Sequence, residues 1–190
     1  KGVLANCHVN VLQTQDHPMF KTYAEELKWL TTDKVRMSWV AKTIKDISTS
    51  GNTLILVDRI SAGTILQEQL EGSVFVSGST KNIDRKEQYD EVSTATNKII
   101  IATYGVASVG INIPRIFNLV LIEPGKSFVR VIQSIGRGIR KAKDKENVQI
   151  WDITSSCKFA KRHLGARKKF YKEANYPYNI EKINYENPYT

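Results

Sequence analysis

Residues 53–77, with the sequence TLILVDRISAGTILQEQLEGSVFVS, contain the alternation that decides the fold class. The stretch begins with a short apolar run at Thr53–Asp58, continues with residues typical of a helix at Ser61–Leu70, and ends with a second apolar run at Val74–Ser77. Short runs that are apolar on both faces, separated by helices, are typical of a parallel sheet covered on both sides. This stretch therefore predicts a strand–helix–strand unit.

The same alternation continues towards the C-terminus. Further apolar runs occupy Lys98–Thr103, Asn118–Ile122 and Val148–Asp152, and helical patterns occupy Asp84–Thr94 and Val129–Lys141. The order of these segments predicts an α/β fold, a doubly wound parallel sheet with helices on both faces. Folds of this class bind ligands at the carboxyl ends of their strands, so the residues that follow each apolar run are candidate site residues.

The flanking segments predict a lead-in and a tail. A strand is expected at Val3–Gln13, and apolar residues recur at helical spacing over Lys21–Ser50, where Thr31-Thr32-Asp33 indicates a cap between two helices. An amphipathic helix is expected at Ser155–Asn175, and the residues after it show no period. We expect residues 1–52 to be an N-terminal strand and helical lead-in, 53–175 the α/β domain, and 176–190 an extended tail.

The composition of the 190 residues is that of a globular protein, with 41% hydrophobic and 25% charged residues. The sequence has no run of 18 apolar residues and no secretory signal, so we expect no membrane association. The two cysteines, Cys7 and Cys157, fit a reducing cytoplasm and argue against a disulfide scaffold or a zinc finger. Because residue 1 is Lys rather than Met, we expect a piece of a longer protein.

The positive charge is concentrated in one quarter of the chain. The net charge is +9, yet residues 126–172 contain 14 Lys and Arg against three acidic residues, and the remainder is slightly acidic. A localised basic segment is typical of a protein that binds a phosphate-bearing partner such as nucleic acid. A solvated helix face would give the same composition, so charge alone leaves both explanations open.

Several nucleotide-binding and hydrolase motifs are absent. No GxxxxGK[ST] phosphate loop is present, because Val120 stands where the loop around Gly125-Lys126-Ser127 requires its first glycine. The motifs GxGxxG, HExxH and GxSxG are also missing. We therefore do not expect the chain to hydrolyse a nucleotide by itself.

A segment rich in glycine and arginine, QSIGRGIR at Gln133–Arg140, is the strongest positive signal. Arg137 and Arg140 are three residues apart, so on a helical turn their guanidinium groups project the same way and suit a polyphosphate. An arginine-rich helix end that complements the helix dipole is the alternative. Turns of small or polar residues follow three other strands, at Asp58-Arg59, Ser77-Gly78-Ser79 and Ala102–Pro114. All of these segments are expected at the ligand-binding edge of the sheet.

The ordered set of segments resembles the second RecA-like domain of superfamily II helicases. Gln133–Arg140 resembles motif VI of that family (QxxGRxxR), Ala102–Pro114 resembles motif V, and Thr53–Arg59 resembles motif IV. Motifs V and VI in this order are specific to the superfamily, and the resemblance extends from about Thr53 to Ile153. It implies a two-lobed enzyme in which ATP and Mg²⁺ are held mainly by a first lobe that this chain lacks.

The resemblance assigns residues to the nucleotide. It implies that Arg140 is an arginine finger, that Arg137 lies beside it at the γ-phosphate, and that Gln133 orders the pair. Three further residues are implied to lie beside the nucleotide: Gly110, Asn112 and Gly136. The family usually has Asp where Asn112 stands, so a ribose contact there is made without charge.

The resemblance also assigns residues to nucleic acid. It implies that Arg59, Gly78 and Thr103 follow the phosphates of one DNA strand, with contacts that are blind to sequence and sensitive to salt. Three cations of the predicted final helix are expected to add affinity for branched or single-stranded DNA: Lys161, Arg162 and Lys168. Aromatic residues of the tail are expected to stack on bases, although the phenylalanines of that helix could simply pack on the sheet.

The combined prediction is the second motor lobe of an ATP-dependent DNA helicase or translocase that remodels branched DNA in recombination, replication and repair. Its partners would be DNA and the upstream RecA-like lobe of the same protein, and the lobe alone would be inactive as an ATPase. One alternative is a stand-alone nucleic-acid-binding module with a helicase-like fold, and another is a small phosphate-ester enzyme. The spacing of Gln133, Arg137 and Arg140 favours the motor over a pure binder.

Overall fold

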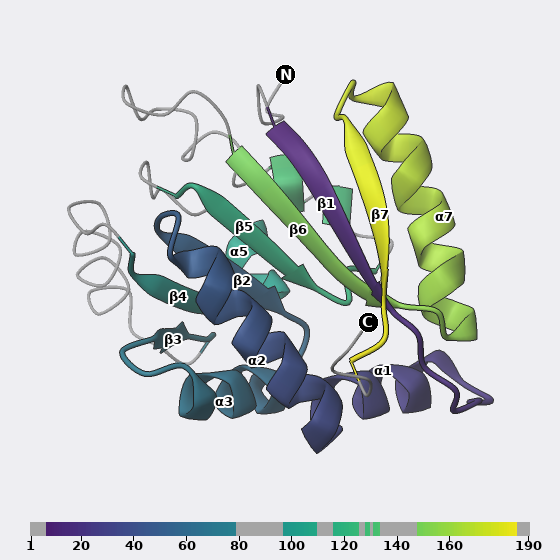
Figure 1. The fold of residues 1–190 in the computed structure, drawn as a ribbon, viewed down its shortest axis with the longest axis horizontal. Coiled ribbons are helices and arrows are strands. Elements are labelled where there is room, and N and C mark those ends of the chain that lie inside the picture. The colour runs from purple at the N-terminus through teal and green to yellow at the C-terminus, as the bar shows by residue number, and fades with distance from the viewer. Residues whose placement is uncertain are drawn as a thin grey trace.

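The computed structural model describes residues 7–78, 97–109, 116–125, 128–129, 131–133 and 148–185 of the chain. Seven strands within these residues form one sheet in the order β3-β4-β2-β5-β6-β1-β7, and every neighbouring pair is parallel (Figure 1). The strands are β1 (Cys7–Thr14), β2 (Thr53–Val57), β3 (Val74–Val76), β4 (Ile99–Thr103), β5 (Asn118–Ile122), β6 (Val148–Ser155) and β7 (Tyr178–Ile183). The sheet confirms the predicted α/β class.

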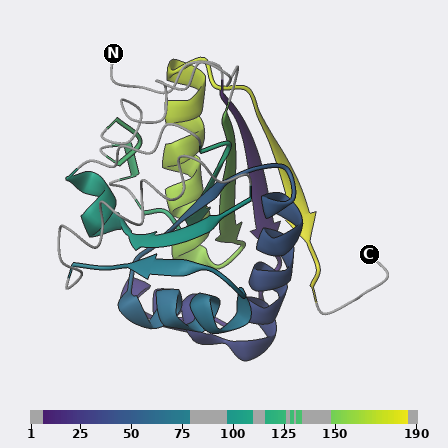
Figure 2. The ribbon, with the colours of Figure 1, turned by 90° about the vertical axis from the view of Figure 1, so that its left-hand side faces the viewer.

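Helices cover both faces of the sheet. Figure 2 shows α7 and α2 on opposite sides of it, and α1 lies beside α2 and α3. The helices are α1 (Tyr23–Thr32), α2 (Lys34–Ser48), α3 (Ile60–Gln69), α5 (Tyr104–Ser108) and α7 (Lys158–Glu173). This arrangement is the three-layered architecture expected when continuous apolar strands alternate with helices.

Two hydrophobic cores, one on each face, explain why the strands are apolar throughout. Leu54 and Leu56 of β2 belong to the core under α5 and α7, whereas Ile55 and Val57 belong to the core under α2 and α3. Successive residues of a strand point to opposite faces, so a strand between two helical layers needs apolar residues at every position. All five residues of β2 are buried.

The boundary between α1 and α2 is set by Asp33, as the sequence predicts. Its amide donates to the carbonyl of Trp29 and ends α1, while its Oδ2 accepts from the amide of Arg36 at 3.0 Å and caps α2. Thr22 caps the start of α1 by accepting from the amide of Glu25. Side-chain acceptors at these positions satisfy amides that have no partner within the helix.

Residues 178–183, which lie in the expected tail, form the edge strand β7. Asn179, Ile180 and Glu181 pair with Asn10, Val11 and Leu12 of β1, and the amide of Val9 donates to the carbonyl of Pro177 at 2.8 Å. Most residues of β7 are exposed. The sheet therefore includes strands from all three predicted parts of the chain, and the division into lead-in, domain and tail stays a prediction.

Neither a membrane span nor a reactive thiol is found in the part of the chain that the structure describes. Its helices are too short or too polar to cross a bilayer. Cys7 and Cys157 are free and buried, and burial raises the pKa of each thiol to about 11. Both thiols are therefore protonated at neutral pH, which makes them poor nucleophiles.

Candidate nucleic-acid interface

Three predicted DNA-contacting residues lie at the ends of three neighbouring strands. Arg59 lies two residues after β2, Gly78 lies two residues after β3, and Thr103 is the last residue of β4. These strands are adjacent and parallel in the order β3-β4-β2, so their carboxyl ends lie at one edge of the sheet. The fold therefore brings the three residues to the edge where ligands bind in this class.

Arg59, Thr103 and Gly78 differ in their local contacts. Arg59 is the N-cap residue of α3, and its side chain, 39% exposed, pairs with the neighbouring Asp58 at an Nε–Oδ2 distance of 3.5 Å. The Oγ1 of Thr103 caps α5 by accepting from the amide of Val106 at 3.2 Å, and a hydroxyl that accepts in this way can also donate. A Cβ on Gly78 would meet no atom within 4 Å, so packing within the protein does not require glycine there.

Helix α7 presents a row of cations to solvent. Five of them are exposed and one is half-buried, and their spacings of three, four and seven residues place them on one side of the helix over about 21 Å. We call these residues the basic stripe: Lys158, Lys161, Arg162, Lys168, Lys169 and Lys172. The opposite side of the helix, which includes Leu164 and Tyr171, is buried against the sheet.

Arg167 is a basic residue of α7 that does not belong to the stripe. It is fully buried, and its guanidinium donates to both oxygens of Asp152 on β6, at 2.7 and 2.9 Å, and to the carbonyl of Pro124 at 2.5 Å. The hydroxyl of Tyr171 donates to the same carboxylate at 2.7 Å. Burial alone would lower the pKa of Arg167, but Asp152 outweighs it and keeps that pKa above its ordinary value. Arg167 therefore attaches α7 to the sheet and adds no charge for a partner.

Glu26 of α1 caps the start of α7. Its buried carboxylate accepts from the amides of Phe159 and Ala160, at 3.0 and 2.8 Å, whereas the N-cap residue Cys157 makes no side-chain cap bond. Amides in the first turn have no partner within the helix, and a carboxylate there also interacts favourably with the helix dipole. Helix α1 thus fixes the end of α7 from which the basic stripe begins.

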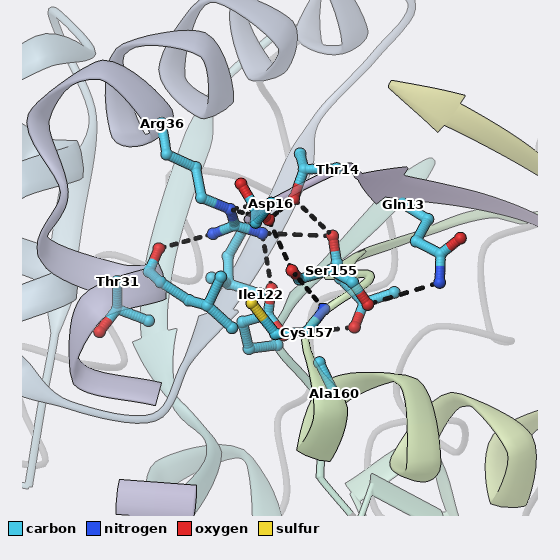
Figure 3. Close-up of polar contacts among 12 residues, drawn as sticks. Gln13, Thr14, Asp16, Thr31, Arg36, Ile122, Ser155, Cys157 and Ala160 are labelled. Carbon is cyan, nitrogen blue, oxygen red and sulfur yellow. Dashed lines mark hydrogen bonds and ion pairs between the residues drawn. The ribbon is translucent and has the colours of Figure 1, made fainter. Parts of the chain in front are cut away.

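A buried network around Arg36 holds the end of β5 (Figure 3). Arg36 donates to Glu123 Oε1 at 2.6 Å, to the carbonyls of Leu30 and Thr154 at 2.5 and 3.2 Å, and to Thr14 Oγ1 at 3.1 Å. Glu123 has φ of 45°, a left-handed backbone that residues other than glycine rarely adopt. Burial raises the pKa of Glu123 to about 7, although Arg36 acts in the opposite direction. A carboxyl group that titrates near neutrality therefore lies at the carboxyl edge of the sheet.

A cavity of about 530 Å³ opens at the same edge. Asp58, Tyr104 and Glu123, which directly follow β2, β4 and β5, line one part of it. The other lining residues are Tyr23, Gly125, Phe128, Phe159, Arg162 and His163. The sequence singles out three residues of this set, because Asp58 and Tyr104 lie in candidate segments at strand ends and Arg162 is a predicted DNA contact. The others resemble ordinary packing residues in the sequence.

Most predicted nucleotide-binding residues lie outside the residues that the structure describes: Gly110, Asn112, Gly136, Arg137 and Arg140. Gln133 is described, and it is exposed. In the described ranges, no group of three or more His, Cys, Asp or Glu side chains is placed to hold a metal ion. The assignment of these residues to a nucleotide therefore stays a prediction.

Comparison with known sequences identifies relatives among viral helicases. The family model for the helicase conserved C-terminal domain matches residues 36–142, more than half of the chain. The ATP-dependent DNA helicase uvsW of enterobacteria phage T4 is 30% identical over 155 residues, which are 79% of this chain and 31% of that protein. Putative helicase 22 of a Sulfolobus islandicus filamentous virus is 32% identical over 104 residues, 53% of this chain and 18% of that protein. The chain thus spans less than a third of either relative.

Comparison with solved structures supports the same fold. The crystal structure of T4 UvsW superposes with a TM-score of 0.80 and 23% identity, covering 94% of this chain and 42% of that one. The E. coli DEAD-box protein SrmB superposes with a TM-score of 0.65 and 17% identity, covering 98% and 96%. The sequence match, together with this shared fold, shows that the chain belongs to the helicase conserved C-terminal domain family, the second RecA-like domain of superfamily II helicases.

Proposed function

We propose that the chain is the second motor lobe of an ATP-dependent DNA helicase or translocase that remodels branched DNA in recombination, replication and repair. The observation that supports a DNA-bound lobe most strongly is the convergence of Arg59, Gly78 and Thr103 on one sheet edge, with Arg162 of the basic stripe lining the cavity at that edge. The phage T4 relative is named an ATP-dependent DNA helicase. Both curated relatives are viral, so we place the protein in the cytoplasm of a host cell.

The DNA contacts follow from the chemistry of these groups. A guanidinium at Arg59, a hydroxyl at Thr103 and a backbone free of side-chain bulk at Gly78 suit phosphate oxygens, and the basic stripe neutralises further phosphates. Such contacts position the protein on the strand without reading its sequence. A lobe that alternately binds and releases a DNA strand can translocate along it. In the proposed translocation cycle, these residues make the contacts to DNA.

The nucleotide side of the proposal rests on sequence. Arg140 and Arg137 would approach the γ-phosphate, Gln133 would order them, and Gly110, Asn112 and Gly136 would lie beside the nucleotide. The upstream lobe would hold most of the ATP and its Mg²⁺. Two guanidinium groups offset the charge that develops on the transferred phosphoryl group, and such an arginine contributes roughly 10³–10⁵ in rate.

The test is DNA-stimulated ATPase activity of the two-lobed protein. Arg140→Ala should lower the rate by at least about a thousandfold, and Arg140→Lys should restore little because an ammonium group lacks the planar fork. The adjacent Lys141→Ala, which also removes one charge, is the matched control and should change the rate less than about tenfold. Binding of DNA without any ATPase activity would instead support the stand-alone binding module.

A further inference from the structure

The cavity at the carboxyl edge has the size and wall of a small-ligand site. Its volume of about 530 Å³ lies within the range of roughly 300–1,000 Å³ that small-molecule sites occupy. Its walls come from three strand ends, from Tyr23 of α1 and from the first two turns of α7. The cap by Glu26 and the ion pair of Arg167 fix α7 against the sheet, so the cavity is part of a rigid framework.

Aromatic rings form one side of this cavity. The ring of Tyr23 lies 6.3 Å from that of Phe159 and 4.7 Å from that of His163, the latter in an edge-to-face arrangement. Phe159 is half-buried, and the Arg162 guanidinium lies 5.6 Å from its ring centroid. A partly exposed ring with a cation beside it is a stacking surface for a flat, aromatic ligand.

The polar groups of the cavity suit an uncharged nucleobase. Asp58 and Glu123 line the cavity beside the Arg162 guanidinium, but Asp58 pairs with Arg59 and Glu123 pairs with Arg36, so the wall is close to neutral and favours an uncharged ligand. The Glu123 oxygens already accept from Arg36 and Thr154, whereas the Asp58 side chain is 43% exposed. An uncharged base can donate from its amino group to Asp58 and accept from Arg162 at a ring nitrogen or carbonyl.

The residues proposed to contact DNA phosphates adjoin this cavity. Asp58 immediately precedes Arg59, and Tyr104 immediately follows Thr103, so two proposed phosphate contacts flank the opening. Arg162 belongs both to the cavity wall and to the basic stripe. We propose that the cavity binds one unstacked nucleobase of the DNA strand, with Phe159 as its stacking surface and Asp58 and Arg162 as its hydrogen-bonding groups. This inference rests on the proposed function, since the base belongs to the strand that the lobe grips.

The test compares two single strands of equal length and equal phosphate number, one of ordinary nucleotides and one of tetrahydrofuran abasic residues. The 190-residue chain should bind the strand that has bases about 5- to 160-fold more tightly, the range that stacking of one base on an aromatic ring contributes. Phe159→Ala should reduce that ratio to near one. Phe159→Leu, which keeps an apolar side chain but removes the ring, should do the same and serves if the alanine variant does not fold.

The control variant is Lys169→Ala, an exposed cation of the stripe outside the cavity wall. It should weaken binding of both strands by the same factor and leave their ratio unchanged.

The result separates this inference from the proposed function. Salt-dependent binding with the same base preference in wild type and both Phe159 variants overturns the base pocket and leaves the DNA-bound lobe standing. If neither strand binds at any salt concentration, the DNA-binding role fails and the base pocket fails with it.

Discussion

Glu123 combines a buried carboxyl group, a left-handed backbone and a position in the cavity wall. A non-glycine residue in this backbone conformation is strained, by roughly 1–3 kcal/mol, and persists only where its surroundings hold it. Here Arg36 and Thr154 hold it through hydrogen bonds to the two carboxyl oxygens. Strain that is held in this way at the end of a strand is typical of functional sites, in agreement with the place of Glu123 at the candidate interface.

The raised pKa of Glu123 predicts a specific pH dependence of stability. The folded-state pKa of about 7 exceeds the ordinary value of 4.5, so the native state binds more protons than the unfolded state between these two pH values. The free energy of unfolding therefore falls as pH rises through this window. Relative to Glu123→Gln, the wild type should lose on the order of 2–3 kcal/mol between pH 5 and pH 8, measured by urea unfolding.

The matched control for this experiment is Glu181→Gln, which removes an exposed carboxylate on β7. Its stability should run parallel to that of the wild type over the same pH range. A constant difference between the wild type and Glu123→Gln would show that Arg36 keeps Glu123 ionised throughout, and the assignment of a near-neutral pKa would then be wrong.

The burial of Arg167 could not be predicted from the sequence. It lies in a basic segment between Lys161 and Lys168, and nothing in that pattern separates it from its solvated neighbours. Its burial depends on Asp152, which comes from a different element, and on the carbonyl of Pro124. Charge counting can locate a basic face, but it cannot show which cation pairs inside the protein, because that depends on contacts between distant residues.

Among the elements, α3 provides a stability test through Gly63. A Cβ at this position would clash with the ring of Phe75 on β3, because the helix lies directly against that strand. Gly63→Ala should therefore destabilise the chain by about 1–2 kcal/mol, overpacking outweighing the better helix propensity of alanine. In a Phe75→Leu background the same change should cost less, which a double-mutant cycle in urea would measure.

Gly165 on α7 should respond in the opposite direction. A Cβ there would meet no atom within 4 Å, and the residue lies in the interior of a 16-residue helix. Gly165→Ala should therefore stabilise the chain by about 0.5–1 kcal/mol through helix propensity alone. If both glycine variants shift the urea midpoint the same way, packing against Phe75 does not explain the glycine at position 63.

The cap on α7 gives a further test at this scale. Glu26→Ala leaves the amides of Phe159 and Ala160 without their acceptor and should lower the free energy of unfolding by about 1–2 kcal/mol. The adjacent Glu25→Ala removes an exposed carboxylate and should change it by less than about 0.5 kcal/mol. Equal effects of the two substitutions, measured by urea unfolding, would contradict the capping role.

Across the whole molecule, local patterns predict the layers but not every strand or the cavity. Apolar runs such as Thr53–Val57 indicate a doubly covered parallel sheet because both faces of each strand are buried. The strand at Tyr178–Ile183 was not predicted because it lies at the sheet edge, where most of its side chains are exposed and the continuous apolar pattern of a buried strand is missing. The cavity could not be predicted because its lining comes from α1, α7 and three strand ends, which are far apart in the sequence.

Both faces of the sheet carry exposed lysines, which allows a test of the basic stripe as a DNA surface. Lys161→Ala combined with Lys168→Ala should weaken single-strand binding and lower the slope of log K against log salt by about 1.4, because each phosphate contact contributes about 0.7. Lys42→Ala combined with Lys45→Ala removes the same charge from exposed positions of α2, across the sheet. That control should leave the slope unchanged in anisotropy titrations. If both pairs lower the slope equally, net charge rather than the position of the stripe attracts the DNA.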